Sequence, residues 1–280
     1  TLETGEGARL AGLEDALTAS VFDQPAACAR LAQAVRISKA GLRAPGRPVG
    51  TYLFSGPTGV GKTELARTLA RTLSVPLHRF DMSEYMEPHS VSRLIGAPPG
   101  YTGYDDGGLL TAAVDRAPHC VLLLDEIEKA HPQVFNVLLQ VMDAGRLTDP
   151  HGKTHDFSNC VLIMTTNAGA AVSTGVPMGF NAGTEADRDA AVRDSEVRAT
   201  FSAEFRNRLD AVVPFEPISR ATAQKIAGRM IEELAGRLAE KSITLTASDA
   251  ALRWIADQGY DPEYGGRPIA RVIRDSIEPA

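Results

Sequence analysis

The sequence lacks the features of disulfide-stabilised and metal-binding proteins. It has only 3 cysteines, Cys28, Cys120 and Cys160, and they are far apart along the chain. Metal sites usually need close pairs such as C-x-x-C, and none of the 6 histidines forms an H-E-x-x-H pattern. We therefore expect three buried, reduced thiols and no metal site made of protein side chains alone.

The sequence also lacks long hydrophobic runs and basic clusters. No apolar stretch approaches the roughly 20 residues that span a bilayer, and the first residues do not form the basic-then-apolar pattern of a signal peptide. The formal net charge is -6 and Lys and Arg form no run, which disfavours nucleic acid as a partner because phosphates bind to basic faces. We expect a cytoplasmic protein with neither a membrane nor nucleic acid as its partner.

The sequence does contain a regular alternation of apolar and amphipathic segments. After a polar start and a helical pattern at about residues 24–40, short apolar runs occur at 51–56, 76–83, 120–126, 160–167 and 211–217. Continuous apolar runs are typical of buried parallel strands, and longer amphipathic stretches between them predict helical crossovers. The predicted fold class is α/β with a five-stranded parallel sheet.

Helical patterns replace the strands after Pro217. They cover about residues 219–240, 249–258 and 267–277, and "SITLT" at 242–246 is a candidate short strand. The proline-containing "PFEPIS" predicts a hinge between a large α/β domain at 1–217 and a small, mostly helical domain at 218–280. Because the chain stops in or just after an amphipathic helix, we expect the small domain to be truncated.

Residues 56–63, "GPTGVGKT", match the phosphate-loop pattern G-x-x-x-x-G-K-[ST] in full. They follow the apolar "TYLFS" and open the amphipathic "TELARTLART", which is the context that the motif requires. Glycines let backbone N–H groups turn toward phosphates, the lysine reaches the β- and γ-phosphates, and a Ser or Thr hydroxyl ligates Mg2+. The predicted ATP-binding residues are Gly56, Pro57, Thr58, Gly59, Val60, Gly61, Lys62 and Thr63, the last of them also a Mg2+ ligand.

Two further strand ends carry polar residues that suit the same chemistry. "VLLLDE" at 121–126 ends in Asp125, which would hold the Mg2+ hydration shell, and Glu126, which would polarise the attacking water as general base. The next apolar run ends in Asn167, whose neutral amide could hold that water or touch the γ-phosphate. An Asn at a strand end is also a common turn residue, so its role stays open at this point.

With the phosphate loop, "LLLDEIEKAH", "TTNAG" and "EFRNRLD" in this order, the chain resembles an AAA+ module of the Clp unfoldase family. The resemblance covers nearly the whole chain and is strongest to the second, C-terminal ATPase module of the ClpA type, followed by the ClpB and ClpC types. It implies an AAA+ P-loop NTPase fold in which Asn167 is the sensor 1 residue. Arg208 matches the arginine finger that reaches the nucleotide of a neighbouring subunit in a hexamer, with Arg206 as the less favoured candidate.

The resemblance also assigns residues to the other side of the nucleotide. Arg267, in "GYDPEYGGRPIAR", matches sensor 2 and would project from the small domain onto the nucleotide. Val21 and Phe22 match the segment that packs on the adenine, and Ile226 would form a small-domain wall. Asp23 stands where such modules usually have Gly. If that Gly needs a positive φ, Asp tolerates it better than most residues, so we expect a local change there rather than lost binding.

Two loops resemble the pore loops of these unfoldases. "GAPPGYTGYDDGG" at 96–108 carries Tyr101, which would grip a threaded polypeptide without reading its sequence. The alternative is a tyrosine that covers a hydrophobic edge of its own domain. "GRLTDPHGKTHDF" at 145–157 would be a second, more polar pore loop.

The stretch "GVPMGFNAG" at 175–183 places two large apolar residues where no periodic pattern would bury them. Unfoldases that serve ClpP carry Ile-Gly-Leu or Ile-Gly-Phe at this point, and here the triplet is Met178, Gly179 and Phe180. Met is flexible enough to fill an aliphatic pocket. By resemblance the triplet docks on a ClpP-like peptidase, and the alternative is that it folds back on its own domain.

These features together predict an ATP-dependent protein unfoldase and translocase, the ATPase subunit of a ClpP-type protease, with no peptidase activity of its own. The expected cofactors are ATP and Mg2+. The expected partners are five further copies of the full-length protein in a homo-hexamer, a ClpP-like peptidase, and unfolded or tagged protein substrates with or without an adaptor. A ClpB-like disaggregase would share every catalytic residue and lack the docking loop. A DNA-linked AAA+ ATPase is disfavoured by the acidic balance, and a non-enzymatic scaffold by the intact nucleotide motifs.

Overall fold

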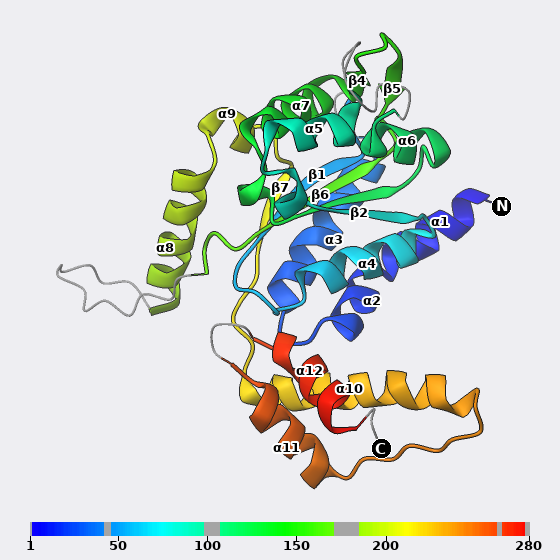
Figure 1. The fold of residues 1–280 in the computed structure, drawn as a ribbon, viewed down its shortest axis with the longest axis vertical. Coiled ribbons are helices and arrows are strands. Elements are labelled where there is room, and N and C mark those ends of the chain that lie inside the picture. The colour runs from blue at the N-terminus through cyan, green and yellow to red at the C-terminus, as the bar shows by residue number, and fades with distance from the viewer. Residues whose placement is uncertain (1, 42–45, 98–106, 171–184, 262–264, 278–280) are drawn as a thin grey trace.

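The computed structural model describes residues 2–41, 46–97, 107–170, 185–261 and 265–277. These residues form a layered α/β part and, below it in Figure 1, a group of three helices from the C-terminal part of the chain. The last strand of the α/β part ends at Pro214, and the first of the three helices begins at Arg220. Among the described residues, no helix is both long enough and apolar enough to cross a membrane.

A five-stranded parallel sheet forms the centre of the α/β part. Its strands are β1 (Gly50–Ser55), β2 (Leu77–Asp81), β3 (Val121–Asp125), β6 (Val161–Thr166) and β7 (Ala211–Pro214), in the order β2-β3-β6-β1-β7. Met164 of β6 lies between Leu53 of β1 and Leu124 of β3, and every pairing in the sheet is parallel. The predicted five-stranded parallel sheet is therefore confirmed, and its strands all end at one edge.

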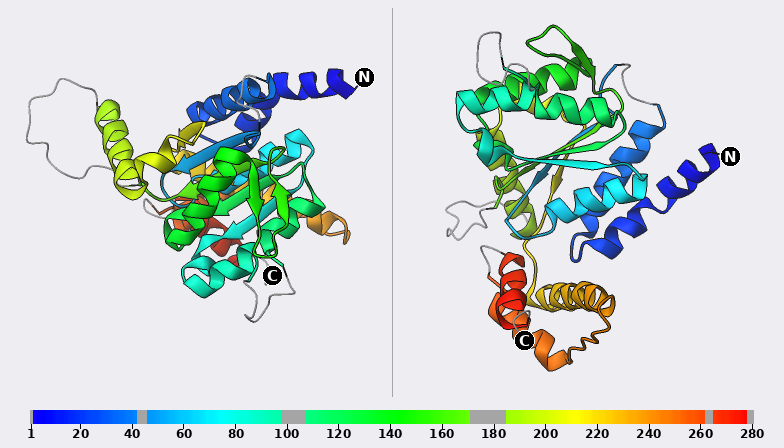
Figure 2. Two further views of the ribbon diagram at one scale, coloured as in Figure 1. Left: turned by 90° about the horizontal axis from the view of Figure 1, so that it is seen from above. Right: turned by 45° about the vertical axis from the view of Figure 1, so that its right-hand side comes forward.

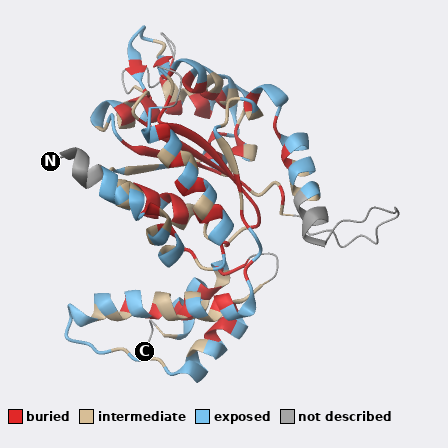
Figure 3. Cartoon of the chain, turned by 180° about the vertical axis from the view of Figure 1, so that it is seen from behind, coloured by how far each residue is buried: buried red, intermediate tan, exposed pale blue. Residues whose placement is uncertain are grey.

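Both faces of this sheet are buried, because helices cover each of them (Figure 3). Successive side chains of a strand point to opposite faces, so Leu53 and Met164 enter one hydrophobic core while Phe54 and Ile163 enter the other. This is why the strands are continuous apolar runs in the sequence rather than alternating ones.

Helices α5 (Pro88–Ile95), α6 (Leu109–Arg116) and α7 (Pro132–Ala144) cover one face, and α2 (Leu13–Ser20), α3 (Pro25–Lys39) and α4 (Lys62–Leu73) cover the other. The remaining helices of this part are α1 (Leu2–Ala11), η1 (Met82–Tyr85), η3 (Ile127–Lys129), α8 (Glu185–Thr200) and α9 (Ala203–Arg206). In both views of Figure 2, α1 extends to the N-terminal end of the chain, away from α8.

Two segments contain elements that the sequence patterns did not predict. Residues before the helix at 24–40 read as a polar start, but the structure forms α1 and α2 there. Leu13 and Leu17 of α2 are fully buried one helical turn apart, and two apolar positions are too few to reveal a period. Within residues 145–157, β4 (Arg146–Thr148) and β5 (Thr154–Asp156) form a short antiparallel hairpin.

The small domain consists of α10 (Arg220–Ala239), α11 (Asp249–Gly259) and α12 (Arg267–Ser276), which share a hydrophobic core of their own. Its three predicted helices are confirmed. The predicted strand at 242–246 is wrong: the chain leaves α10 through a left-handed residue, Ser242 (φ 60°), and Ile243 is 50% exposed. A strand needs a hydrogen-bonded partner, and none of the described strands pairs with this segment.

All three cysteines are buried free thiols, as predicted. Cys120 and Cys160 immediately precede β3 and β6, which pair in parallel register, and their Sγ atoms lie 3.6 Å apart.

Candidate nucleotide site

The phosphate loop connects β1 to α4 at the carboxyl edge of the sheet. Gly56, Gly59 and Gly61 adopt φ angles of 141°, 75° and 104°, which L side chains rarely take. A Cβ atom on Gly61 would lie 2.7 Å from Cγ1 of Val21, so this position also needs glycine for space. The three glycines curve the loop and leave Lys62 as the first residue of α4.

The ammonium group of Lys62 is buried and held from three sides. Nζ donates to the carbonyl oxygens of Gly56 (2.5 Å) and Pro57 (2.9 Å) and to Oδ1 of Asn167 (3.0 Å). Burial lowers the pKa of Lys62 to about 8, although the nearby carboxylates, Glu128 foremost, oppose this shift. The side chain therefore loses its charge more readily than an exposed lysine. An anion beside it would stabilise its charged form.

Asp125 and Glu126 are consecutive, but their carboxylates pair with different basic residues. Asp125, 8% exposed, accepts hydrogen bonds from Thr165 Oγ1 on β6 and from Arg79 Nε on β2 (2.9 Å). Glu126 adopts a left-handed φ of 56°, its backbone N–H donates to Thr165 Oγ1 (3.0 Å), and its carboxylate pairs with Lys129 at 2.5 Å. Thr165 thus bridges the two acids, and the sharp turn at Glu126 separates their carboxylates.

Asn167 lies at the end of β6, opposite the phosphate loop. Its Oδ1 accepts from Lys62 Nζ and from Thr58 Oγ1 (3.2 Å), and its backbone N–H donates to Oε1 of Glu128 in η3 (3.0 Å). The amide is therefore fixed between the loop and the segment that carries the acids.

These residues line one cavity of about 490 Å³ between the sheet edge and the small domain. That volume lies within the range of small-molecule sites, about 300–1,000 Å³. The predicted residues that line it are Val21, Phe22, Thr58, Gly59, Val60, Gly61, Lys62, Thr63, Asp125, Glu126, Asn167, Ile226 and Arg267. Gly56 and Pro57 do not line it and instead give their carbonyl oxygens to Lys62.

The small domain contacts the phosphate loop directly. The backbone N–H of Gly266 donates to the carbonyl of Gly59 (3.2 Å), and a Cβ on Gly265 would lie 2.8 Å from the carbonyl oxygen of Thr58. Glycine is thus needed where the two backbones meet. Arg267 begins α12 immediately after this contact, which brings its side chain to the cavity.

Asp23 adopts a φ of 55°, so its position does require the left-handed region. Its carboxylate accepts hydrogen bonds from Ser219 Oγ (3.0 Å) and from Thr222 Oγ1 at the start of α10. The expected local change is therefore a direct link between the segment at Val21–Phe22 and the small domain. That nucleotide binding tolerates Asp23 remains a prediction.

Arg208 does not line the cavity. Its Nε lies 2.7 Å from Asp143 Oδ2, and its Nη2 lies 3.1 Å from Glu204 Oε1. Arg206 donates from Nε to the carbonyl of Phe201 (3.1 Å). A place away from its own cavity suits a residue that acts on a neighbouring subunit, but a surface ion pair would look the same, so the arginine-finger role remains a prediction.

The predicted pore and docking residues lie largely outside the described residues. This holds for Tyr101 and for the triplet Met178, Gly179 and Phe180. The hairpin at 145–157 is described, and His155 of β5 lies with Nδ1 2.8 Å from Asp115 Oδ1 and Nε2 3.1 Å from Asp149 Oδ2. The contact with Asp115 attaches the hairpin to α6, the contact with Asp149 lies within the hairpin, and the role of the hairpin as a pore loop remains a prediction.

Several residues that organise the cavity were not predicted. Thr165 had a usable signal, since a hydroxyl that interrupts a buried apolar strand next to two acids needs a polar partner. Glu128 had a weaker one, as a third acid two residues after Glu126. Arg79 and Arg229 had none, because a single Arg in a strand or helix is most often a solvated surface residue.

Comparison with known proteins identifies this architecture. Residues 47–212 match the family described as "AAA domain (Cdc48 subfamily)", and residues 218–280 match the "C-terminal, D2-small domain, of ClpB protein". The chain is 51% identical over 269 residues to a "ClpA homolog protein" of Fuscovulum blasticum, covering 96% of this chain and 33% of that protein.

Two other relatives have similar identities. The "Chaperone protein ClpB" of Agrobacterium fabrum is 49% identical, with 98% of this chain and 31% of the relative covered. The "ATP-dependent Clp protease ATP-binding subunit ClpC" of Staphylococcus saprophyticus is 48% identical, with 98% of this chain and 34% of the relative covered. The chain thus spans about a third of the length of these relatives. It belongs to the AAA domain family and, within it, to the Clp ATPases, whose C-terminal ATPase module it matches.

Proposed function

We propose that the chain is an ATP-hydrolysing module that drives protein unfolding and translocation. The observation that carries this proposal is that the phosphate loop, the acid pair and the small domain meet at one cavity of about 490 Å³. Hydrolysis of ATP requires a cation for the phosphates, a carboxylate for Mg2+ and a base for water. Lys62, Asp125 and Glu126 line the cavity and can supply all three.

The residues present fit ATP with Mg2+. The positive φ angles of Gly56, Gly59 and Gly61 turn the loop as a phosphate cradle requires. Oxygen atoms of Thr63 and Asp125 would hold Mg2+, which prefers such hard ligands and, when bound, neutralises phosphate charge. Because Arg79 contacts Oδ2 of Asp125, it would share or release that oxygen when the metal binds.

On the apolar side, Val21, Phe22 and Ile226 line the same cavity and would pack on the adenine. Glu126 would accept a proton from the attacking water after leaving Lys129, and Asn167 would orient that water. Arg267, at the start of α12, would contact the phosphates from the small domain and make its orientation depend on the nucleotide.

We further propose that hydrolysis is completed between subunits. Clp family members generally form hexamers, and Arg208 lies outside the cavity of its own chain. A cation supplied by a neighbour would stabilise charge in the transition state and make activity depend on assembly.

The proposed boundary between domains, 217/218, is supported by the two family matches. One match ends at residue 212 and the other begins at residue 218.

For the cargo and the partner, we propose polypeptide and a ClpP-like peptidase. Tyr101 would move the chain through the pore, and Met178, Gly179 and Phe180 would dock on the peptidase. The names of the relatives do not separate this from a disaggregase, since a chaperone ClpB and a protease subunit ClpC are 49% and 48% identical. The triplet favours the peptidase, since several weak docking contacts on one ring act together.

The experiment is capture of a ClpP-like peptidase by the assembled full-length ring, with the triplet intact or changed to Ser-Gly-Ser. We expect the intact ring to retain peptidase and the changed ring to lose it while ATP turnover is kept. Equal capture by both rings would overturn the peptidase partnership and favour the disaggregase. Absence of ATP turnover in both would overturn the proposed chemistry.

A further inference from the structure

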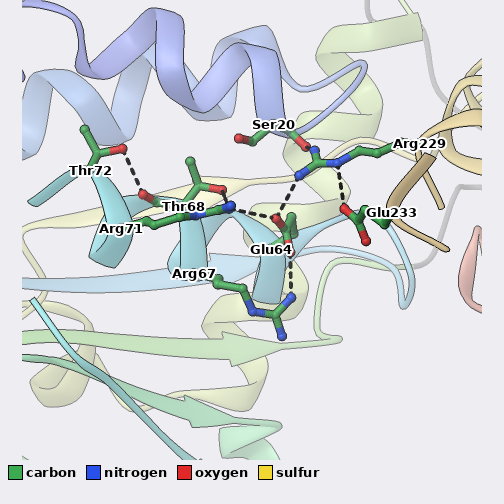
Figure 4. Close-up of polar contacts among 8 residues, drawn as sticks. All are labelled: Ser20, Glu64, Arg67, Thr68, Arg71, Thr72, Arg229 and Glu233. Carbon is green, nitrogen blue, oxygen red and sulfur yellow. Dashed lines mark hydrogen bonds and ion pairs between the residues drawn. The ribbon is translucent and has the colours of Figure 1, made fainter. Parts of the chain in front are cut away.

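Arg229 of α10 spans the gap between the small domain and two segments of the α/β part (Figure 4). Its Nη1 donates to the carbonyl oxygen of Ser20, and its Nη2 lies 3.2 Å from Oε1 of Glu64. Its Nε donates to Oε1 of Glu233, one turn further along its own helix (3.2 Å). All three guanidinium nitrogens are therefore engaged, and two of them hold the opposite domain.

Each acceptor lies beside a part of the nucleotide cavity. Ser20 is the last residue of α2 and directly precedes Val21 and Phe22, the proposed adenine segment. Its carbonyl is one of the acceptors at a helix C-terminus that have no partner within the helix, and a cation is favoured there. Glu64 directly follows Thr63, the proposed Mg2+ ligand, in the first turn of α4. One side chain of the small domain thus links both ends of the cavity.

The guanidinium group of Arg229 is partly shielded from solvent. Arg229 and Glu64 have side chains that are only 26% and 28% exposed, so their attraction is screened less than that of a surface pair. On α10, Ile226, Arg229, Met230 and Glu233 line the cavity at the spacing of one helical face. The same face of α10 therefore carries both Ile226, the proposed adenine wall, and Arg229, which contacts the α/β part.

A second contact fixes the same helix to the same segment. Thr222 and Ser219, at the start of α10, donate to the carboxylate of Asp23. Thr222 and Arg229 are seven residues apart, which is about 10 Å along a helix. With two attachment points at this separation, α10 cannot swing away from the adenine segment at either point without breaking a contact.

We propose that Arg229 is a positioning residue that fixes the adenine segment against the small domain, with Asp23 as its second anchor, and so sets the affinity for the base end of the nucleotide. This rests on the proposed ATP site. The guanidinium serves because its planar fork reaches two acceptors on different segments at once, which an ammonium group cannot do equally well. At the phosphate end, Glu64 also pairs with Arg67 and Arg71 of its own helix, so that end keeps its arrangement without Arg229.

The test measures binding of ADP and of inorganic tripolyphosphate to the 280-residue chain and to Arg229→Ala. We expect ADP to bind about three- to tenfold more weakly to the variant, a range that a lost, partly exposed charged hydrogen bond accounts for. Tripolyphosphate has no base and should bind within twofold of the parent value. In the assembled full-length ring, the same variant should raise KM for ATP and leave kcat within twofold.

The matched control is Arg71→Ala. Arg71 contacts the same Oε1 of Glu64 at the same 3.2 Å, but from within α4, and does not line the cavity. It should change neither affinity, and Arg229→Lys should restore part of the ADP affinity. Asp23→Gly is a second variant that cannot strain the backbone, since glycine accepts a φ of 55°, and it should weaken ADP binding about two- to threefold.

Unchanged ADP binding by Arg229→Ala would overturn the inference, as would an equal loss for ADP and tripolyphosphate, which would make Arg229 a simple phosphate cation. A parent chain that binds neither ligand would instead overturn the proposed nucleotide site.

Discussion

The two ends of the cavity are built in opposite ways. At the phosphate end, Lys62 and Asp125 belong to short motifs, and their positions follow from glycine turns and parallel strand ends. At the adenine end, Arg229 and Asp23 hold residues about 200 positions away, through single side-chain contacts that no motif predicts. The residues proposed for catalysis thus lie in short sequence motifs. The residues that couple the two domains make contacts that form only when the chain folds.

The largest effect should come from Glu126→Gln, which tests whether chemistry is confined to the phosphate end. Without the general base, we expect ATP turnover by the assembled ring to fall about 100-fold or more. ADP affinity should stay within twofold, since the amide keeps the shape of the side chain. The comparison of turnover with binding in the same preparation is the measurement, and unchanged turnover would show that Glu126 is not the base.

The next effect concerns pH and arises from Lys62. Burial lowers its pKa to about 8, and bound phosphates would raise it again. Below pH 8 the ammonium is already charged, so affinity should not depend on this group. Above pH 8 binding must take up a proton, so ADP affinity should fall by up to about tenfold per pH unit.

Calorimetry at pH 9 in two buffers of different ionisation enthalpy should reveal this proton uptake. Arg229→Ala should show the same pH profile, displaced to weaker affinity, because its effect lies at the other end of the cavity. A flat profile between pH 8 and 9.5 would contradict the assignment.

A smaller effect should come from Gly61→Ala, where the phosphate loop meets Val21 of the adenine segment. The added Cβ would meet Cγ1 of Val21 at 2.7 Å and would sit on a strained φ of 104°. We expect ADP and tripolyphosphate to lose affinity together, each about three- to tenfold, since loop and adenine segment both shift. Loss for one ligand alone would show that the two ends are independent even here. Gly152→Ala, in the β4–β5 hairpin with φ 82° and open space around it, is the control for backbone strain.

The contrast between the two ends of the cavity also explains how much of the fold and of the site the sequence could predict. The sheet and the phosphate loop follow from apolar runs and glycine spacing, which depend on neighbours in the chain. The strand at 242–246 failed because a β-rich pentapeptide carries no information about a partner strand, and none pairs with it among the described strands. Arg229 could not be found, because only its contacts with Ser20 and Glu64 in the folded chain separate it from the exposed Arg67 and Arg71.

Asp23 lies between these cases. The resemblance indicated that Asp23 stands where such modules usually have Gly, and the structure shows a positive φ there. It could not indicate that the carboxylate would bind Ser219 and Thr222, because those hydroxyls come from another domain. A departure from a family pattern therefore pointed to a place in the chain without revealing its contact.

The most direct test of this account measures ADP affinity and the rate of ATP turnover at saturation for Glu126→Gln and Arg229→Ala in one assembled full-length preparation. The account predicts that Glu126→Gln loses turnover and keeps affinity, and that Arg229→Ala loses affinity and keeps turnover. If both variants lost both properties to the same extent, the separation between a phosphate end for chemistry and an adenine end for coupling would be contradicted.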